Sequence, residues 1–229
     1  MCIVRSQREL REFYLNAIAD GAQTAERLRA PVSERFARFL NGIGYDAPRA
    51  ALELGYGMGT YTVALARSGF DVVAVDQVPA RILRSRLAES SDWAHHIDIV
   101  EQRVENYSVT NNFGIVVAKD VLHYLRRDQV REVLTRCIQR APAAAGHFLE
   151  MFTDITRTDR QGRRVLIEGE AAYTAAAFCD VIEHLYNGWT VQISLMPHAE
   201  RNTDSPRNYF EANRITVSAY RRTPAGVAR

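Results

Sequence analysis

One segment, residues 51–76 with the sequence ALELGYGMGTYTVALARSGFDVVAVD, constrains the fold of this chain more than any other. An apolar run leads into three glycines at alternate positions, then into an amphipathic stretch and a second apolar run that ends in Asp76. A strand, a glycine turn and a helix in this order gather several main-chain N–H groups in one concavity. Glycine suits such a turn because the backbone can approach a ligand without a Cβ in the way. The segment therefore predicts a β–α–β unit with a ligand at the turn and Asp76 at the edge of the neighbouring strand.

The rest of the chain repeats this alternation of short apolar runs and amphipathic stretches. The apolar runs are residues 51–54, 72–75, 97–100, 114–118 and 147–152, and helix-like segments lie between them at 60–68, 79–89, 128–140 and 170–186. Near-continuous apolar strands separated by helices indicate a parallel sheet covered on both faces. Two later runs, 189–196 and 214–221, alternate in polarity with no helix between them, and they predict an antiparallel close to the sheet.

Two segments ahead of the sheet, residues 6–20 and 33–41, carry apolar side chains at helical spacing, with Ser33 as a candidate N-cap. The expected fold is therefore α/β: a Rossmann-like, mostly parallel seven-stranded sheet with helices on both faces, an antiparallel last strand and an N-terminal helical cap. We expect residues 1–48 to form the cap and residues 49–229 to form the ligand-binding domain.

Composition excludes several other classes of protein. The 229 residues are 47% apolar and 24% charged, with a net charge of +2 and basic residues dispersed along the chain, which gives no strong field for nucleic acid. Three separated cysteines without CxxC spacing predict neither a disulfide framework nor a metal site. Neither a signal peptide nor an apolar run of membrane-spanning length is recognisable. We therefore expect a cytoplasmic protein without membrane or nucleic-acid partners.

The spacing of the glycines separates two classes of cofactor. Dinucleotide-binding turns read GxGxxG, whereas this chain has GxGxG preceded by Glu53. The resulting ExGxGxG arrangement resembles motif I of the class I S-adenosylmethionine-dependent methyltransferases. The resemblance implies that the glycine loop contacts the methionine part of S-adenosylmethionine and that Asp76 binds both ribose hydroxyls. S-adenosylhomocysteine would be the product.

The resemblance extends over about residues 50–152. Arg103-Val104-Glu105 stands where the family has an adenine-contacting Asp-Ala-Glu, and residues 113–125, FGIVVAKDVLHYL, resemble its fourth strand and following turn, with Gly114 in place of the usual Asp. An alternative interpretation of Lys119 is a solvated charge at the end of the strand. The cofactor-binding residues implied are Glu53, Gly55, Tyr56, Gly57, Gly59, Thr60, Asp76, Gln77, Arg81, Arg103, Val104, Glu105, Lys119, Val121 and Tyr124.

Candidates for catalysis lie mainly in the turn after the fourth strand. His123 is a candidate general base because an imidazole titrates near neutrality; the alternative is a histidine packed in the structure. Asp120 can orient an amine or hydroxyl, or cap a helix. Tyr14 can close over the donor site, or pack with its neighbours. His147 and Glu150 lie on the predicted strand at 147–152, and each can belong either to the core or to the floor of the pocket.

The acceptor class is indicated less directly. The turn after the fourth strand lacks the Asn/Asp-Pro-Pro-aromatic sequence of nucleic-acid amino-methyltransferases, which favours a small molecule. The tail loosely resembles the tellurite-resistance type of small-molecule methyltransferase, although Arg201-Asn202-Thr203-Asp204 replaces its His-Arg-Thr-Asp turn. The arginines of residues 157–164 suit either capture of an acidic acceptor or an exposed polar loop.

The predicted function is therefore methyl transfer to an O, N or S atom of a small molecule by a monomer or homodimer. Two alternatives remain open from the residues. One is a non-catalytic or repurposed domain that binds S-adenosylhomocysteine, and the other is an NAD(P)-dependent oxidoreductase.

Overall fold

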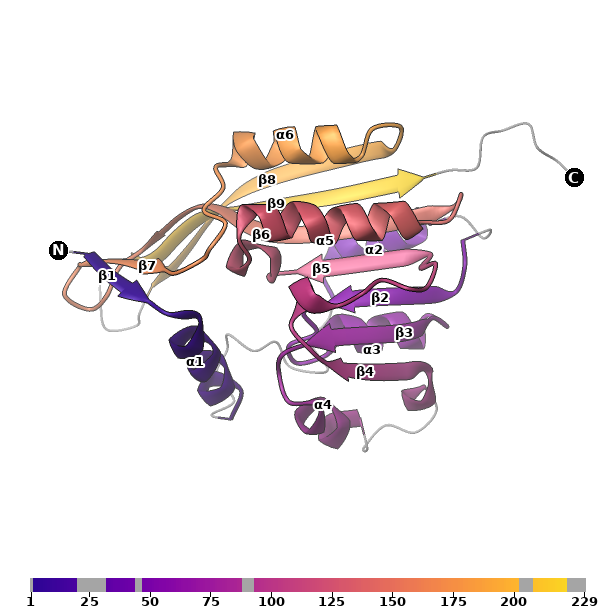
Figure 1. Cartoon of the computed structure of the whole chain (residues 1–229), viewed down its shortest axis with the longest axis horizontal. Coiled ribbons are helices and arrows are strands. Elements are labelled where there is room, and N and C mark those ends of the chain that lie inside the picture. Colours follow the sequence, from indigo (N-terminus) through magenta and orange to yellow (C-terminus); the bar gives the residue numbers. More distant parts are fainter. Residues whose placement is uncertain (1, 20–31, 44–46, 88–92, 202–207, 222–229) are drawn as a thin grey trace, which may run out of the picture.

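The computed structural model describes residues 2–19, 32–43, 47–87, 93–201 and 208–221, and a twisted sheet of seven strands forms its centre (Figure 1). The order across the sheet is β4-β3-β2-β5-β6-β9-β8. Strands β2 to β6 pair in parallel, and β9 is antiparallel to both of its neighbours. The seven strands are β2 (Ala50–Leu54), β3 (Asp71–Asp76), β4 (Ile97–Glu101), β5 (Ile115–Lys119), β6 (Ala145–Arg157), β8 (Thr190–Arg201) and β9 (Asn208–Arg221). The predicted mostly parallel sheet with an antiparallel last strand is confirmed.

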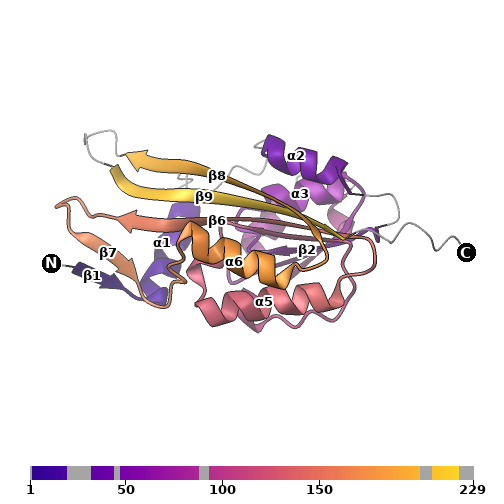
Figure 2. The same ribbon diagram turned by 90° about the horizontal axis from the view of Figure 1, so that it is seen from above.

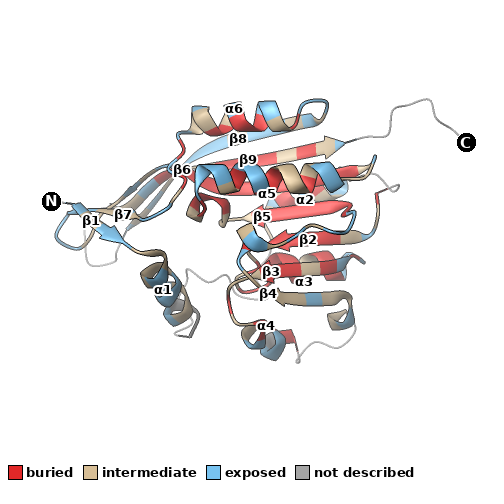
Figure 3. Cartoon of the chain, viewed as in Figure 1, coloured by how far each residue is buried: buried red, intermediate tan, exposed pale blue. Residues whose placement is uncertain are grey.

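Helices cover both faces of this sheet, as Figure 2 shows from above. Leu52 and Leu54 belong to one buried cluster with residues of α5 and α6, while Ala51 belongs to a second cluster with residues of α2 and α3. Figure 3 shows burial concentrated in the strands and in the helix sides that face them. The helices are α2 (Glu34–Asn41), α3 (Thr60–Arg67), α4 (Ala80–Leu87), α5 (Arg127–Arg140) and α6 (Ala175–Leu185), with short 3₁₀ turns η1 (Ala94–His96), η2 (Val104–Asn106) and η3 (Leu122–Tyr124).

Helix α2 packs directly on the sheet. The hydroxyl of Ser33 accepts a hydrogen bond from the N–H of Phe36, so Ser33 caps the helix as predicted. The rings of Phe36 and Phe39 lie 5.2 and 5.4 Å from the ring of Phe148 in β6 and are almost fully buried. Aromatic pairs of this kind add about 0.5–1.5 kcal/mol beyond the area they bury. The division of the chain at residue 48 stays a prediction, and α2, on its N-terminal side, shares the core of the sheet.

A second, two-stranded parallel sheet was not expected from the sequence. This sheet pairs β1 (Cys2–Arg5) with β7 (Arg164–Ile167). From β1 the chain continues directly into α1 (Gln7–Ala19). The side-chain amide of Gln7 donates to the carbonyls of Tyr124 and Glu168, at 3.2 and 2.7 Å. These contacts fix the start of α1 beside the turn that follows β5.

The helix predicted at 170–186 is shorter in the structure. It begins only at Ala175, because the Thr174 hydroxyl accepts a hydrogen bond from the N–H of Ala177 and caps the helix there. Residues 202–204 of the tail resemblance lie outside the described residues. Among the residues that the structure describes, no helix is both long and apolar enough to cross a membrane.

Candidate active site

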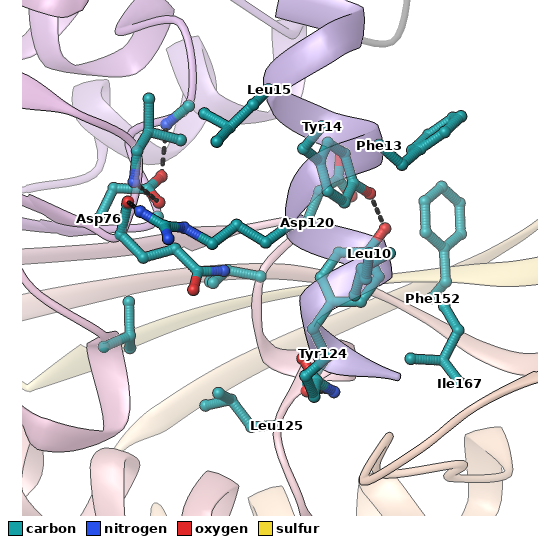
Figure 4. A pocket seen from close by; sticks show the side chains of 18 of the residues that line it. Leu10, Phe13, Tyr14, Leu15, Asp76, Asp120, Tyr124, Leu125, Phe152 and Ile167 are labelled. Carbon is teal, nitrogen blue, oxygen red and sulfur yellow. Dashed lines mark hydrogen bonds between the residues drawn. The ribbon is translucent and has the colours of Figure 1, made fainter. Parts of the chain in front are cut away.

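A cavity of about 980 Å³ lies at the carboxyl ends of the parallel strands. Pockets that hold one small ligand span about 300–1,000 Å³, so this cavity lies at the upper end of that range. One side of its lining comes from the segments that follow β2 to β5, and α1 lies across it from the other side (Figure 4). The carboxyl edge of an open α/β sheet is where such folds bind their ligands.

The glycine loop between β2 and α3 forms one wall of the cavity. Gly55, Gly57 and Gly59 all have positive φ values, of +79°, +49° and +82°. Residues with a Cβ rarely adopt this left-handed conformation, because the Cβ would clash with the backbone. A Cβ built on Gly55 would lie only 2.6 Å from the Cβ of Val121, while one on Gly57 would meet nothing within 4 Å. The loop therefore packs tightly against the turn after β5 and leaves its middle open to the cavity.

Asp76 ends β3 next to this loop. Its carboxylate accepts the N–H of Gly57 at 2.8 Å and the N–H of Val78 at 3.1 Å. Burial raises the pKa of Asp76, and the two main-chain hydrogen bonds act in the opposite direction. The carbonyl of the next residue, Gln77, accepts from the guanidinium of Arg11 at 3.3 Å, which joins α1 to this strand end.

Several predicted cofactor residues support the loop from behind. Glu53 is buried and accepts a hydrogen bond from the hydroxyl of Thr62 in α3. The hydroxyl of Tyr56 donates to the carbonyl of Val78 at 2.6 Å. Thr60, the first residue of α3, lines the cavity. Among the described residues, Gly59 and Arg81 are outside the cavity lining, and Arg81 is exposed on α4.

The segment after β4 completes this half of the cavity. Arg103, Val104 and Glu105 all line it, and the guanidinium of Arg103 binds the Glu105 carboxylate at 2.5 Å. The carbonyl of Glu105 accepts from Arg136 of α5 at 2.7 Å. Because Val104 is buried, its side chain anchors this turn against the core.

The other half of the cavity is rich in aromatic side chains. Figure 4 shows Phe13 and Tyr14 on α1, with Tyr124 and Phe152 in the lining of the same cavity. The hydroxyls of Tyr14 and Tyr124 share a hydrogen bond, and the two rings meet edge to face at 5.5 Å. Phe152 in turn meets Phe210 of β9 at 5.0 Å. Burial raises the pKa of Tyr124, so its phenol stays protonated at neutral pH.

Asp120 supplies a carboxylate at the boundary of the two halves. Its backbone has a positive φ of +54°, and its N–H donates to the carbonyl of Glu150 at 2.8 Å. The ammonium of Lys119 lies 2.6 Å from the carboxylate, and Arg214 of β9 lies 3.4 Å away. Burial alone would raise the pKa of Asp120, but the two cations outweigh it and hold the pKa below its usual value. Asp120 is therefore ionised at neutral pH.

Two arginines frame the aromatic half. Arg214 binds the buried carboxylate of Glu150 at 2.6 Å and lies 4.4 Å above the ring of Phe152. Arg157 of β6 binds Glu170 through two hydrogen bonds of 2.7 and 2.6 Å and lies 5.3 Å from the ring of Phe210. Each guanidinium thus has a carboxylate partner and an aromatic neighbour.

Comparison with known proteins shows which proteins this arrangement resembles. Residues 51–141 match the family model described as a methyltransferase domain. Nodulation protein S of Bradyrhizobium diazoefficiens is 35% identical over 94 residues, which are 41% of this chain and 44% of that protein. Over residues 51–141 this chain is therefore similar to methyltransferase domains. The matched part spans less than half the length of that relative.

Solved methyltransferase structures share the fold. The 1,6-didemethyltoxoflavin N1-methyltransferase of Burkholderia thailandensis, with its namesake compound and S-adenosylhomocysteine bound, has a TM-score of 0.60 at 17% identity over 93% of this chain and 87% of its own. The N-methyltransferase NodS of Bradyrhizobium japonicum, also with S-adenosylhomocysteine, has a TM-score of 0.51 at 18% identity over 82% and 86%. At these identities the likeness establishes the methyltransferase fold.

His123 is not among the residues that line the cavity. Its side chain is 1% exposed, and one ring nitrogen accepts from the N–H of Phe152 at 3.5 Å. Burial lowers the pKa of His123 to about 3. Such an imidazole is a weak base at neutral pH, which favours the packed alternative over a general-base role for His123. Its contacts fit the packed alternative, and His147 is similarly buried against Tyr186.

Other side chains differ from their expected surroundings. Lys119 is only 13% exposed and lines the cavity, so the reading as a solvated charge is wrong. The interpretation of residues 157–164 as an exposed polar loop is wrong for Arg157. This residue ends β6, and its side chain is only 14% exposed. Phe210 and Arg214 were missed as site residues. The strand pattern was visible, but which β9 residues reach the cavity depends on the pairing of β9 with β6.

Proposed function

We propose that this protein transfers the methyl group of S-adenosylmethionine to a nitrogen atom of a small molecule. One observation carries the proposal: a single cavity joins the glycine loop and Asp76 to an aromatic half that contains the ionised Asp120. Two structurally similar proteins are described as N-methyltransferases, which favours nitrogen over oxygen or sulfur. A cavity that encloses donor and acceptor can hold an acceptor lone pair in line with the methyl carbon, which supplies much of the rate.

In this proposal the cofactor lies along the glycine loop. Asp76 accepts hydrogen bonds from the ribose hydroxyls, since a carboxylate offers several acceptor sites. The open main chain at Gly57 takes the methionine part. Val104 and Glu105 contact the adenine. Lys119, Val121 and Tyr124 line the region between donor and acceptor.

The acceptor lies between α1 and the ends of β6 and β9. Asp120 accepts an N–H of the acceptor and orients its lone pair. Tyr14 and Tyr124, which both line the cavity, provide hydroxyls and flat apolar surface. A neutral nitrogen needs no general base before attack, so the reaction is feasible with His123 packed in the structure.

Methyl transfer from labelled donor tests this function. The protein is incubated with S-adenosyl-[methyl-³H]methionine and a bacterial small-molecule extract, and the label is followed into chromatographic fractions. Transfer by the wild-type protein and its loss in Asp76→Ala support the proposal. Binding of S-adenosylhomocysteine without transfer to any fraction would favour the non-catalytic alternative, and tight NADPH binding instead would favour the oxidoreductase.

We further propose that the protein works in the cytoplasm as a monomer or homodimer, without nucleic-acid or membrane partners. The net charge of +2 gives little attraction for nucleic acid. Cys2, Cys137 and Cys179 are free, which suits a reducing compartment. Residues 1–48 would act as the cap of the domain, with α1 as the wall of the cavity that faces the cofactor loop.

A further inference from the structure

We propose that the methyl acceptor is a flat, uncharged nitrogen heterocycle that stacks in the aromatic half of the cavity. This inference rests on the proposed function and specifies its substrate class. Three features of the described residues carry it: the balance of charge, the flat side chains, and the position of Asp120.

The charged groups around the acceptor half neutralise one another. Lys119 pairs with Asp120 at 2.6 Å, Arg214 with Glu150 at 2.6 Å, and Arg157 with Glu170 at 2.6 Å. An acidic acceptor would have to compete with these built-in carboxylates for the cations. Glu200, another acid of the lining, accepts a hydrogen bond from the hydroxyl of Tyr209 at 2.5 Å and lies 3.1 Å from a ring nitrogen of His198. Glu9 and Glu12 of α1 pair with Arg5 and Arg8. The arrangement therefore favours an acceptor without net charge.

Flat groups line this half from two sides. Phe13 and Tyr14 of α1 and Phe152 of β6 line the cavity (Figure 4). Phe210 of β9 also lines it and contacts Phe152. Phe13 is 57% exposed, so its ring is left without a full packing partner. A planar ligand between these sides would cover aromatic surface with good geometry, because aromatic rings pair best offset or edge to face. A guanidinium also stacks on flat rings, and Arg214 lies within this region.

Asp120 gives the heterocycle a point of attachment next to the donor. The following residue, Val121, packs against Gly55 of the cofactor loop. A carboxylate has about four acceptor sites, and Lys119 and Arg214 do not use them all. A ring or exocyclic N–H bound here would place its nitrogen near the methyl group. The nitrogen lone pair then forms the new N–C bond as the S–C bond breaks, the bonding pair stays on sulfur, and the proton leaves through Asp120 to water.

Ligand binding in the presence of saturating S-adenosylhomocysteine tests the inference without knowledge of the natural acceptor. Three probes are compared by saturation-transfer NMR and calorimetry: 1(2H)-isoquinolinone, which is flat and neutral with a ring N–H, its octahydro analogue, which is not flat, and 2-naphthoate, which is flat and anionic. We expect the isoquinolinone to bind at least about five-fold more tightly than either of the others.

Two variants locate the probe. Phe210→Leu should weaken isoquinolinone binding about three-fold to ten-fold, while Ile193→Ala, on the neighbouring strand and outside the cavity lining, should leave it unchanged. Equal binding of the saturated or anionic probe, or no binding of the isoquinolinone at millimolar concentration, overturns the inference while S-adenosylhomocysteine still binds. Failure of S-adenosylhomocysteine itself to bind contradicts the proposed function and the inference with it.

Discussion

Asp76 accepts a hydrogen bond from the main-chain N–H of Gly57 over 2.8 Å, so the carboxylate that ends β3 also holds the middle of the glycine loop. Asp76 thus shapes the loop and also lines the cavity, and a carboxylate keeps acceptor sites beyond those that bind the N–H groups of Gly57 and Val78. If Asp76 binds the ribose as proposed, the cofactor meets a loop that the same residue has already ordered.

Asp76→Ala should therefore weaken binding of S-adenosylhomocysteine by about 1.5–3 kcal/mol, the cost of losing hydrogen bonds to a charged group. The measurement is titration calorimetry at neutral pH. Asp71→Ala is the matched control, because Asp71 is an exposed carboxylate at the other end of the same strand. Equal affinities of the two variants would remove Asp76 from the cofactor site.

The close contact between Gly55 and Val121 leads to a prediction about stability. Gly55→Ala should destabilise the fold by about 1–3 kcal/mol more than Gly188→Ala, measured by chemical denaturation. The two glycines have nearly equal φ values of +79° and +81°, so the backbone strain of an alanine is matched. Only at Gly55 does the added Cβ meet a neighbour, at 2.6 Å. Equal losses would mean that the loop can move away from Val121.

The ion pair between Arg157 and Glu170 is largely buried, with side-chain exposures of 14% and 8%. Glu170→Gln should lower the free energy of unfolding by about 3–5 kcal/mol, because it leaves the arginine charge buried without its partner. The double variant Arg157→Met with Glu170→Leu should be much less destabilised. A loss in the double variant as large as in Glu170→Gln would show that the pair stabilises the fold by itself.

Two buried histidines predict how stability changes with pH. Burial lowers the pKa of both His123 and His147 to about 3, whereas a histidine in an unfolded chain has a pKa near 6.5. As pH falls below about 6.5, the unfolded chain takes up protons that the folded chain does not. Each histidine should then reduce stability by about 1.4 kcal/mol per pH unit until its folded pKa is reached.

His147→Gln isolates one of these contributions. Between about pH 5.5 and 4, the stability of this variant should fall less steeply than that of the wild type, by about 1.4 kcal/mol per unit. Near pH 8 the two stability curves should run parallel, which controls for the packing cost of the substitution. Parallel curves at low pH as well would mean that His147 is protonated in the folded protein.

The donor half was predictable because its signals are local. The three glycines, the strand before them and Asp76 lie within 26 residues of one another, and each follows from backbone geometry. The sheet followed from the alternation of apolar runs and helices. Even Ser33 was identified, since an N-cap depends on its immediate neighbours.

The acceptor half depends on long-range pairing that leaves little local trace. Cys2 pairs with Arg164 in the small sheet, and Arg214 reaches Glu150 only because β9 lies antiparallel beside β6. In the short turn η3, His123 is turned into the core while the adjacent Tyr124 lines the cavity. A turn of three residues carries no sequence period from which this difference in direction could be read.

Calorimetric titration of the purified protein with S-adenosylmethionine, S-adenosylhomocysteine and NADPH tests the central claim, that the cavity at the glycine loop holds the methyl donor. We expect S-adenosylmethionine and S-adenosylhomocysteine to bind competitively, one molecule per chain, with no binding of NADPH. NADPH binding in the absence of any affinity for S-adenosylmethionine or S-adenosylhomocysteine would contradict this claim.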